Sequence, residues 1–251
     1  MLAAKERLVE IDVFRGIAIL AMGCFHFLFD LVFFGGVRLD LYSLASPWFW
    51  LGRFAAVSFV GLAGVSLYLR FYRHGLNESG KKLAKDFLSR GIFIFGLGLL
   101  ITVFTFVFFP RYTVWFGVLH LIGIAAILSI PLIKNPKAAG VLGLLILVLG
   151  VGISLNAFSF PSWLPIFPFS FSTFDYFPLF PWLGVFWLGI GIGNFLYQKT
   201  KPRFWKLIPS DPDNLFTRIL AWLGRHSLLV YFVHQPILVA ILALALGVKP
   251  F

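Results

Sequence analysis

Three histidines lie within stretches of sequence that are otherwise apolar: His26, His120 and His234. An ionisable group at bilayer depth is energetically costly, and such groups often carry protons or contact substrates. Because imidazole titrates near neutral pH, it can act as a general base, a general acid or a proton relay. The chemistry expected of these residues is therefore proton transfer inside a membrane.

A carboxylate and a guanidinium accompany the first of these histidines. Asp30 follows His26 by four residues and shares its helix face, so that the carboxylate can fix the tautomer of the ring. Arg53 would pair with Asp30 or face an anionic group, because an unpaired charge at that depth costs on the order of 3 kcal/mol. Purely structural roles remain open: interhelical hydrogen bonds for the histidines and an ion pair for Asp30 with Arg53.

The composition indicates which elements position these residues. The 251 residues are 60% hydrophobic and 12% charged, with a mean hydropathy of +0.93, which one soluble core cannot bury. Crossing a hydrocarbon core takes roughly 20 helical residues. Runs of that length predict seven membrane-spanning helices, at 13–35, 48–70, 88–109, 112–133, 138–157, 178–198 and 227–247. We therefore predict an all-α membrane helix bundle forming a single domain over residues 1–251, with 216–225 as a surface helix.

The basic residues predict the orientation of the chain. Most of the 21 Lys and Arg residues fall in alternate loops, and none lies between Lys137 and Lys199. By the positive-inside rule this places the N-terminus in the cytoplasm and the C-terminus outside, which agrees with an odd number of spans. The net charge of +11 then reflects membrane topology, and no nucleic-acid partner is expected. The predicted location is the cell membrane, plasma or inner, which the chain crosses several times.

Depth along the helices predicts which residues meet. At about 1.5 Å per residue, His26 lies roughly 14 Å from the inner end of its span. His120 and His234 then reach within roughly 6 Å of the same level. The three imidazoles are thus predicted to line one cavity near the membrane midplane.

Other features allow two interpretations each. The aromatic and proline-rich segment 156–177 predicts either interfacial anchoring or a lid for a sugar or lipid head group. Within it, Asp175 predicts either an N-terminal helix cap or a substrate contact. The six cations of the 70–90 loop set orientation or hold phosphates. Glycines in the fifth and sixth spans indicate close helix packing, and no metal site is expected.

Residue motifs along nearly the whole chain resemble membrane-bound acyltransferases. Ile11-Asp12-x-x-Arg15-Gly16-Ile17-Ala18, with His26 eleven residues after the arginine, resembles the first helix of the acyltransferase-3 family. The remaining motifs resemble small prokaryotic members of the heparan-α-glucosaminide N-acetyltransferase catalytic-domain family. They are Ser46-Pro47-x-Phe49, Gly52-Arg53, Arg90-Gly91, Phe116-Gly117-x-x-His120-Leu121-x-Gly123, Asp175-Tyr176-Phe177-Pro178, Gly224-Arg225-His226-Ser227-Leu228 with Tyr231, and His234-Gln235-Pro236.

The resemblance implies transfer of an acetyl group from acetyl-CoA, as co-substrate, to an amino sugar, glycan or glycolipid at the outer side. Heparan-type enzymes use a histidine in the first outer loop, and the stretch from Gly35 to Pro47 contains none. The role of the first-helix histidine in the acyltransferase-3 family is therefore the better one to carry over to His26. The sequence does not decide which molecule accepts the acetyl group or whether transfer passes through an acyl-histidine intermediate. It also leaves open whether the protein is a homodimer.

Individual residues of these motifs have predicted roles. His26 is the predicted general base, oriented by Asp30, while His120 or His234 stabilises the oxyanion or returns a proton to the leaving thiolate. Predicted substrate and cofactor contacts are Arg15, Arg53, Arg90, Asp175, Tyr176, Arg225, His226, Tyr231 and Gln235.

Other function classes use the same residues differently. A proton-coupled transporter or flippase would relay protons through the His and Asp residues. A haem-binding electron carrier would use imidazoles of facing helices as iron ligands. A retinal receptor is poorly supported, because no predicted span carries a buried lysine for a Schiff base.

Overall fold

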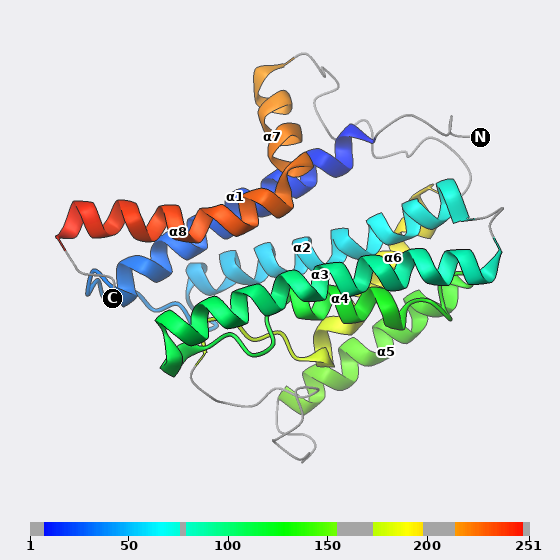
Figure 1. Ribbon diagram of the computed structural model, residues 1–251, viewed down its shortest axis with the longest axis horizontal. Coiled ribbons are helices and arrows are strands. Elements are labelled where there is room, and N and C mark those ends of the chain that lie inside the picture. The colour runs from blue at the N-terminus through cyan, green and yellow to red at the C-terminus, as the bar shows by residue number, and fades with distance from the viewer. Residues whose placement is uncertain (1–7, 76–78, 155–172, 198–213, 248–251) are drawn as a thin grey trace. The chain divides into compact units, whose positions relative to one another are not determined.

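The computed structural model describes residues 8–75, 79–154, 173–197 and 214–247, and every regular element among them is helical. The elements are α1 (Val9–Phe33), α2 (Pro47–Arg70), the π-helical turn η1 (Phe71–Gly75), α3 (Gly80–Phe108), the 3-10 turn η2 (Pro110–Tyr112), α4 (Val118–Leu128), α5 (Pro136–Ser154), α6 (Leu179–Tyr197), α7 (Leu215–Arg225) and α8 (Ser227–Leu246). The all-α prediction is confirmed for the described residues (Figure 1).

Six helices are long and apolar enough to cross a membrane: α1, α2 extended to Arg73, α3, α5, α6 and α8. Large apolar side chains remain exposed on them, for example Ile92 and Val103 on α3 and Val148 on α5. In water such surface would be unfavourable, whereas lipid chains solvate it. The chain is therefore a multi-pass membrane protein.

The fourth predicted span differs from the prediction. It forms only the 11-residue α4, about 16 Å long, which is shorter than a bilayer crossing requires. An extended Gly117 precedes the helix, and Pro131 lies just beyond it. From Ser129 the backbone continues in turns, with the N–H of Leu132 donating to the carbonyl of Ser129 at 3.0 Å. Hydropathy could not reveal this interruption, because the turn residues are themselves apolar.

The helices form two compact units. Among the described residues, the first contains 60–75, 79–154 and 173–197, and the second contains 8–59 and 214–247. The boundary falls within α2, at Val60. The prediction of a single domain stays a prediction.

In the first unit, glycines set the spacing between helices. A Cβ atom on Gly143 of α5 would lie 2.6 Å from the backbone nitrogen of Leu188 in α6, and one on Gly184 would lie 2.6 Å from the carbonyl oxygen of Gly143. Gly140 and Gly191 face each other in the same way. Close packing, the role predicted for the glycines of these two spans, is confirmed at these positions.

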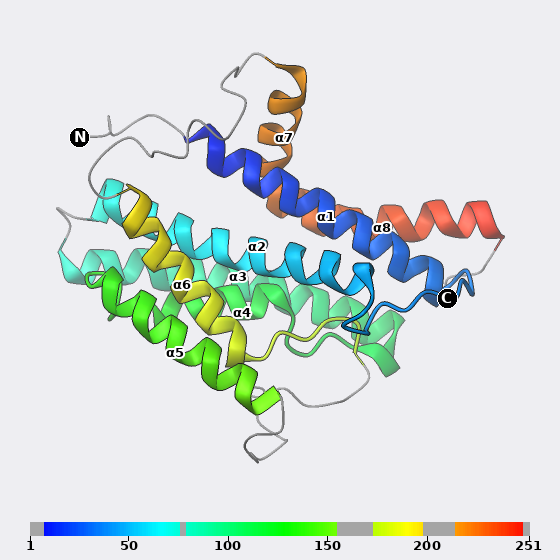
Figure 2. The same ribbon diagram turned by 180° about the vertical axis from the view of Figure 1, so that it is seen from behind.

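In the second unit, α7 crosses α1 through two further glycines. A Cβ on Gly16 would collide with the carbonyl of Leu220, and one on Gly224 with the carbonyl of Asp12. Val13 completes the buried contact. Figures 1 and 2 show α7 standing across the direction shared by α1 and α8. The predicted helix at 216–225 is thus confirmed as a separate element that precedes α8.

Candidate functional site

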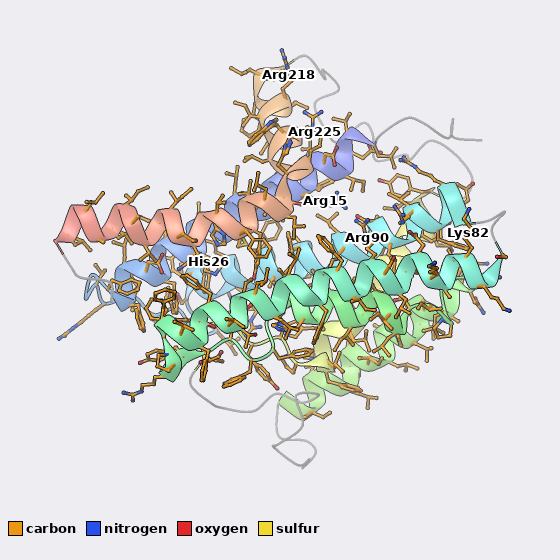
Figure 3. The ribbon with its side chains drawn as sticks, viewed as in Figure 1. Arg15, His26, Lys82, Arg90, Arg218 and Arg225 are labelled. Atoms are coloured by element: carbon orange, nitrogen blue, oxygen red, sulfur yellow. The ribbon has the colours of Figure 1, made fainter. Side chains whose placement is uncertain are left out.

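Two of the three predicted histidines face each other in the second unit. The ring centroids of His26 on α1 and His234 on α8 are 4.9 Å apart, with an angle of 62° between the ring planes. Figure 3 labels His26 on the ribbon of α1. The meeting of these two imidazoles is what their similar depth predicted.

The hydrogen bonds of the two rings determine their tautomers. His26 Nδ1 lies 3.0 Å from the carbonyl oxygen of Met22, and His234 Nδ1 lies 2.7 Å from that of Tyr231. A carbonyl can only accept, so in each neutral ring the proton is on Nδ1 and Nε2 carries the lone pair. His234 Nε2 is buried and has no hydrogen-bond partner. The pair therefore presents two basic nitrogens.

A carboxylate and an amide complete the group. Asp30 is fully buried, and its Oδ1 accepts a hydrogen bond from Gln235 Nε2 at 2.7 Å. Asp30 Oδ2 and Gln235 Oε1 are buried without partners. We call His26, Asp30, His234 and Gln235 the lone-pair cluster. All four residues were predicted from the sequence, but the pairing of Asp30 with Gln235 was not, because a contact across 205 positions leaves no local signal.

Two expected contacts are replaced by others. The proton-bearing nitrogen of His26 is oriented by the Met22 carbonyl, where Asp30 had been expected. The carboxylate of Asp30 has an amide partner, where Arg53 had been expected, and the Arg53 guanidinium lies 5.0 Å from the centre of the Phe49 ring. Backbone carbonyls are present at every residue, so sequence alone gave no reason to choose Met22.

The three unpartnered atoms of the lone-pair cluster are all hydrogen-bond acceptors. Leaving such an atom buried and unpaired costs about 1–3 kcal/mol, and native proteins rarely tolerate it without a functional reason. N–H or O–H groups of a bound molecule are the partners that such acceptors require. The Tyr231 ring, whose centroid is 5.7 Å from that of His234, adds an aromatic wall.

His120 lies in the first unit and has a different environment. Its Nδ1 accepts from the backbone N–H of Gly117 at 3.1 Å, and its Nε2 is 3.3 Å from Thr102 Oγ1. Since the Thr102 hydroxyl donates its own proton to the carbonyl of Val114 at 2.6 Å, it accepts from Nε2–H. Both ring nitrogens are therefore occupied, and this side chain caps the N-terminus of α4.

Asp175 reinforces the same helix terminus. Its Oδ2 accepts from the N–H of Val118 at 3.1 Å, a favourable position for a negative charge on the dipole of α4. Phe177 donates its N–H to the carbonyl of Phe116 at 2.9 Å, and Tyr176 forms a β-bridge with Phe116. Of the two interpretations of Asp175, the structure shows the cap, on a helix 57 residues away along the chain.

This loop also shifts the acidity of its side chains. Burial raises the pKa of Asp175 to about 6, although the hydrogen bond from Val118 opposes the shift. Burial likewise raises the pKa of Tyr176 to about 12. Residues 156–172, the larger part of the aromatic segment for which a lid was one interpretation, lie outside the described residues.

The basic residues that were predicted to contact substrate or cofactor are found in both units. In the second unit, Arg15 lies 3.7 Å from Asp12, and Arg225 ends α7 (Figure 3). His226 closes that helix, with Nδ1 2.9 Å from the carbonyl of Trp222. In the first unit Arg90 is exposed on α3. No group of three or more His, Cys, Asp or Glu side chains in the described part of the chain could hold a metal ion.

Comparison with known families confirms the resemblance. The sequence model of the family described as heparan-alpha-glucosaminide N-acetyltransferase, catalytic, matches residues 7–236, a range that includes the lone-pair cluster. Neither the curated proteins nor the solved structures gave a match. The matched range covers most of the chain and implies acetyl-CoA as the donor. The chain therefore belongs to the heparan-α-glucosaminide N-acetyltransferase catalytic family and is an acetyl-CoA-dependent N-acetyltransferase of the membrane.

Proposed function

We propose that the protein transfers the acetyl group of cytosolic acetyl-CoA to the amino group of an amino sugar, glycan or glycolipid presented at the outer side of the membrane. The proposal places the N-terminus in the cytoplasm, as the basic residues predict. The observation that carries it is the facing pair of imidazoles, His26 and His234, each with the lone pair on Nε2.

His26 is the general base. An amino sugar carries its nitrogen as an ammonium ion at neutral pH, and the ion must lose a proton before it can attack the thioester carbon. His26 Nε2 accepts that proton, and the Nδ1–H bond to Met22 keeps the lone pair at Nε2. The new C–N bond forms, the C–S bond breaks, and the thiolate leaves. Each turnover yields one amide, one coenzyme A thiol and one proton.

Asp30 and Gln235 hold the amino group. Asp30 Oδ2 and Gln235 Oε1 are buried acceptors without partners, so an ammonium ion can donate to both. The 2.7 Å hydrogen bond between the two side chains fixes the carboxylate in place. The acetyl acceptor is therefore selected for a cationic, donor-rich end.

His234 serves the leaving group. Its Nε2 is unpartnered and its ring faces that of His26, so it can accept a proton displaced from the amine and pass it to the thiolate. Tyr231 packs beside it as part of the binding wall. Arg53, next to Phe49, is assigned to the acetyl acceptor, and Arg15 of the same unit to the phosphates of coenzyme A.

His120, Asp175 and Tyr176 receive positioning roles. The first two satisfy backbone N–H groups at the start of α4, and the third pairs with Phe116 in the same turn. Both ring nitrogens of His120 have hydrogen-bond partners, so we place this residue outside the chemical step. It holds α4 in position within the first unit.

Proteoliposomes test the proposal. Acetyl-CoA is supplied on one side and glucosamine on the other, and N-acetylglucosamine and free coenzyme A are both measured. Wild type should form the two products in equal amounts, while His26→Ala should form neither. His74→Gln, which alters a histidine outside the lone-pair cluster, is the matched control and should retain activity. Full activity of His26→Ala would contradict the assignment.

The same assay separates the second candidate function. Buried, unpartnered Asp30 Oδ2 and His234 Nε2 would also suit a proton relay in a proton-coupled transporter or flippase. That function predicts movement of glucosamine with the pH gradient and no thioester cleavage. Flux without release of coenzyme A would favour the transporter over the proposed transferase.

A further inference from the structure

The exposed face of α7 has a composition that the acetyl-transfer site does not explain. The helix has 11 residues, about 16 Å, which is too short to span a bilayer. Its inner face packs on α1 through Leu220 and Gly224. Its outer face exposes four large apolar side chains, with relative exposures of 70% for Leu215, 65% for Phe216, 49% for Ile219 and 50% for Trp222.

The direction of α7 relative to its neighbours in the same unit is informative. It stands across α1 and α8, both of which have spanning length, and α8 begins at Ser227 immediately after the turn at His226 (Figures 1 and 2). It crosses α1 near Asp12 and Gly16, in the first turns of that helix. When α1 and α8 cross the bilayer, α7 therefore lies along the membrane surface at the end where both helices begin.

The charges of α7 match an anionic surface. Arg218 and Arg225 are both exposed and are seven residues apart, which places them on one side of the helix. No acidic residue occurs within α7. In the sequence before it, Lys199, Lys201, Arg203 and Lys206 precede the two acids Asp211 and Asp213. The positive-inside rule places this end in the cytoplasm, where the leaflet surface carries negative charge.

We propose that α7 is an interfacial helix that binds anionic phospholipid of the cytoplasmic leaflet. Leu215, Ile219 and Trp222 enter the boundary between head groups and acyl chains, with Phe216 beside them. Arg218 and Arg225 bind the lipid phosphates. Because Gly16 and Gly224 fix α7 tightly on α1, the bound lipid sets the depth of the helix that carries His26. A second copy of the chain and coenzyme A are the competing occupants.

Depth measurements test the apolar half of this proposal. The full chain carrying Cys24→Ala is reconstituted in phosphatidylcholine vesicles containing phosphatidylglycerol. One nitroxide label is attached at a time, through Leu215→Cys, Ile219→Cys, Trp222→Cys or Arg218→Cys. The first three labels should be reached by oxygen more than by a water-soluble nickel chelate, and the label at position 218 should show the reverse. Equal access of the chelate to all four, or spin-spin broadening between copies, would overturn the proposal.

A charge-removal variant tests the phosphate half. Native mass spectrometry measures the phosphatidylglycerol retained by wild type, by Arg218→Gln/Arg225→Gln and by the control Lys81→Gln/Lys82→Gln, which removes two exposed cations from α3. We expect several-fold less retained lipid for the α7 variant and wild-type retention for the control. Wild-type retention by the α7 variant would overturn the proposal. So would weaker binding of coenzyme A with unchanged lipid retention, because α7 would then be a coenzyme site.

Discussion

The lone-pair cluster of α1 and α8 and the cap of α4 contain the same residue types, but these residues have different roles in the two regions. Each contains a histidine and an aspartate in an apolar environment. At the α4 cap both nitrogens of His120 have partners, and Asp175 accepts from the N–H of Val118. In the lone-pair cluster His234 Nε2 and Asp30 Oδ2 have none. We propose that available lone pairs, rather than burial, distinguish the reactive site from the structural one.

The difference originates in what each histidine donates to. His26 and His234 each donate Nδ1–H to a carbonyl of their own helix, at Met22 and Tyr231. The lone pair of each ring is then on Nε2. His120 accepts a hydrogen bond at Nδ1 and donates one at Nε2, so that neither ring nitrogen is left for another partner. A histidine that satisfies only one nitrogen within the protein is prepared to bind something else.

The largest expected difference between the two regions comes from replacing the aspartate of each by asparagine. Asp30→Asn removes the charge that receives the ammonium ion, and we expect kcat/KM to fall by about 100-fold, since charge-assisted bonds are worth roughly 1.5–3 kcal/mol. Asp175→Asn retains a side chain that caps a helix well, so activity should stay within about twofold. The measurement is acetyl-transfer kinetics on both variants. Equal losses would remove the distinction between the two regions.

A smaller loss is expected at Gln235. Gln235→Leu removes both the bond to Asp30 and the acceptor Oε1 while keeping an apolar side chain in α8. We expect KM for the acetyl acceptor to rise about tenfold, the worth of one buried hydrogen bond, with KM for acetyl-CoA unchanged. Steady-state kinetics with each substrate varied in turn provide the test. A rise in both constants would indicate general damage to the site.

The reverse pattern is expected at the α4 cap. His120→Ala removes two hydrogen bonds and an imidazole ring that is only 2% exposed, at a cost of about 3 kcal/mol of folding stability. Thermal unfolding in detergent should show a clear drop in Tm, whereas His26→Ala should leave Tm close to that of wild type. An unchanged Tm for His120→Ala would contradict its capping role.

The smallest effect is a dependence of stability on pH. The pKa of Asp175 is raised in the folded protein from 3.8 to about 6, so the folded state binds the proton more tightly than the unfolded state. Its contribution to stability is therefore greatest below pH 4 and declines as the pH rises to 6. We expect Tm to fall across that window. Asp175→Asn should abolish this part of the dependence, and an identical profile in the variant would refute the attribution.

Much of the fold followed from hydropathy and glycine spacing. Six predicted spans became long helices, because an apolar run of that length has few alternatives in lipid, and Gly143 with Gly184 set the packing of α5 on α6. The fourth span failed because an extended Gly117 and the turns after Ser129 limit the helix while leaving hydropathy high. The hydropathy of the sequence does not reveal where a helix is interrupted within an apolar run.

The residues of the candidate site could be predicted from the sequence, but their hydrogen bonds could not. The expected depths of His26 and His234 predicted that the two rings would meet, because an α-helix rises a fixed distance per residue. The orienting group of His26 is a backbone carbonyl, and the partner of Asp30 is 205 positions away. Tautomers depend on such partners, so sequence could not separate His26 from His120. That separation required coordinates.

The most direct test of the account is coenzyme A release from acetyl-CoA in the presence of glucosamine, measured for His26→Ala and His120→Ala at equal concentrations of folded protein. The account predicts that His26→Ala loses acetyl transfer by about 100-fold or more, as expected for removal of a general base. It predicts that the folded fraction of His120→Ala retains most of its activity. Full activity of His26→Ala, or equal losses in both, would contradict the central claim that the lone-pair cluster performs the chemistry.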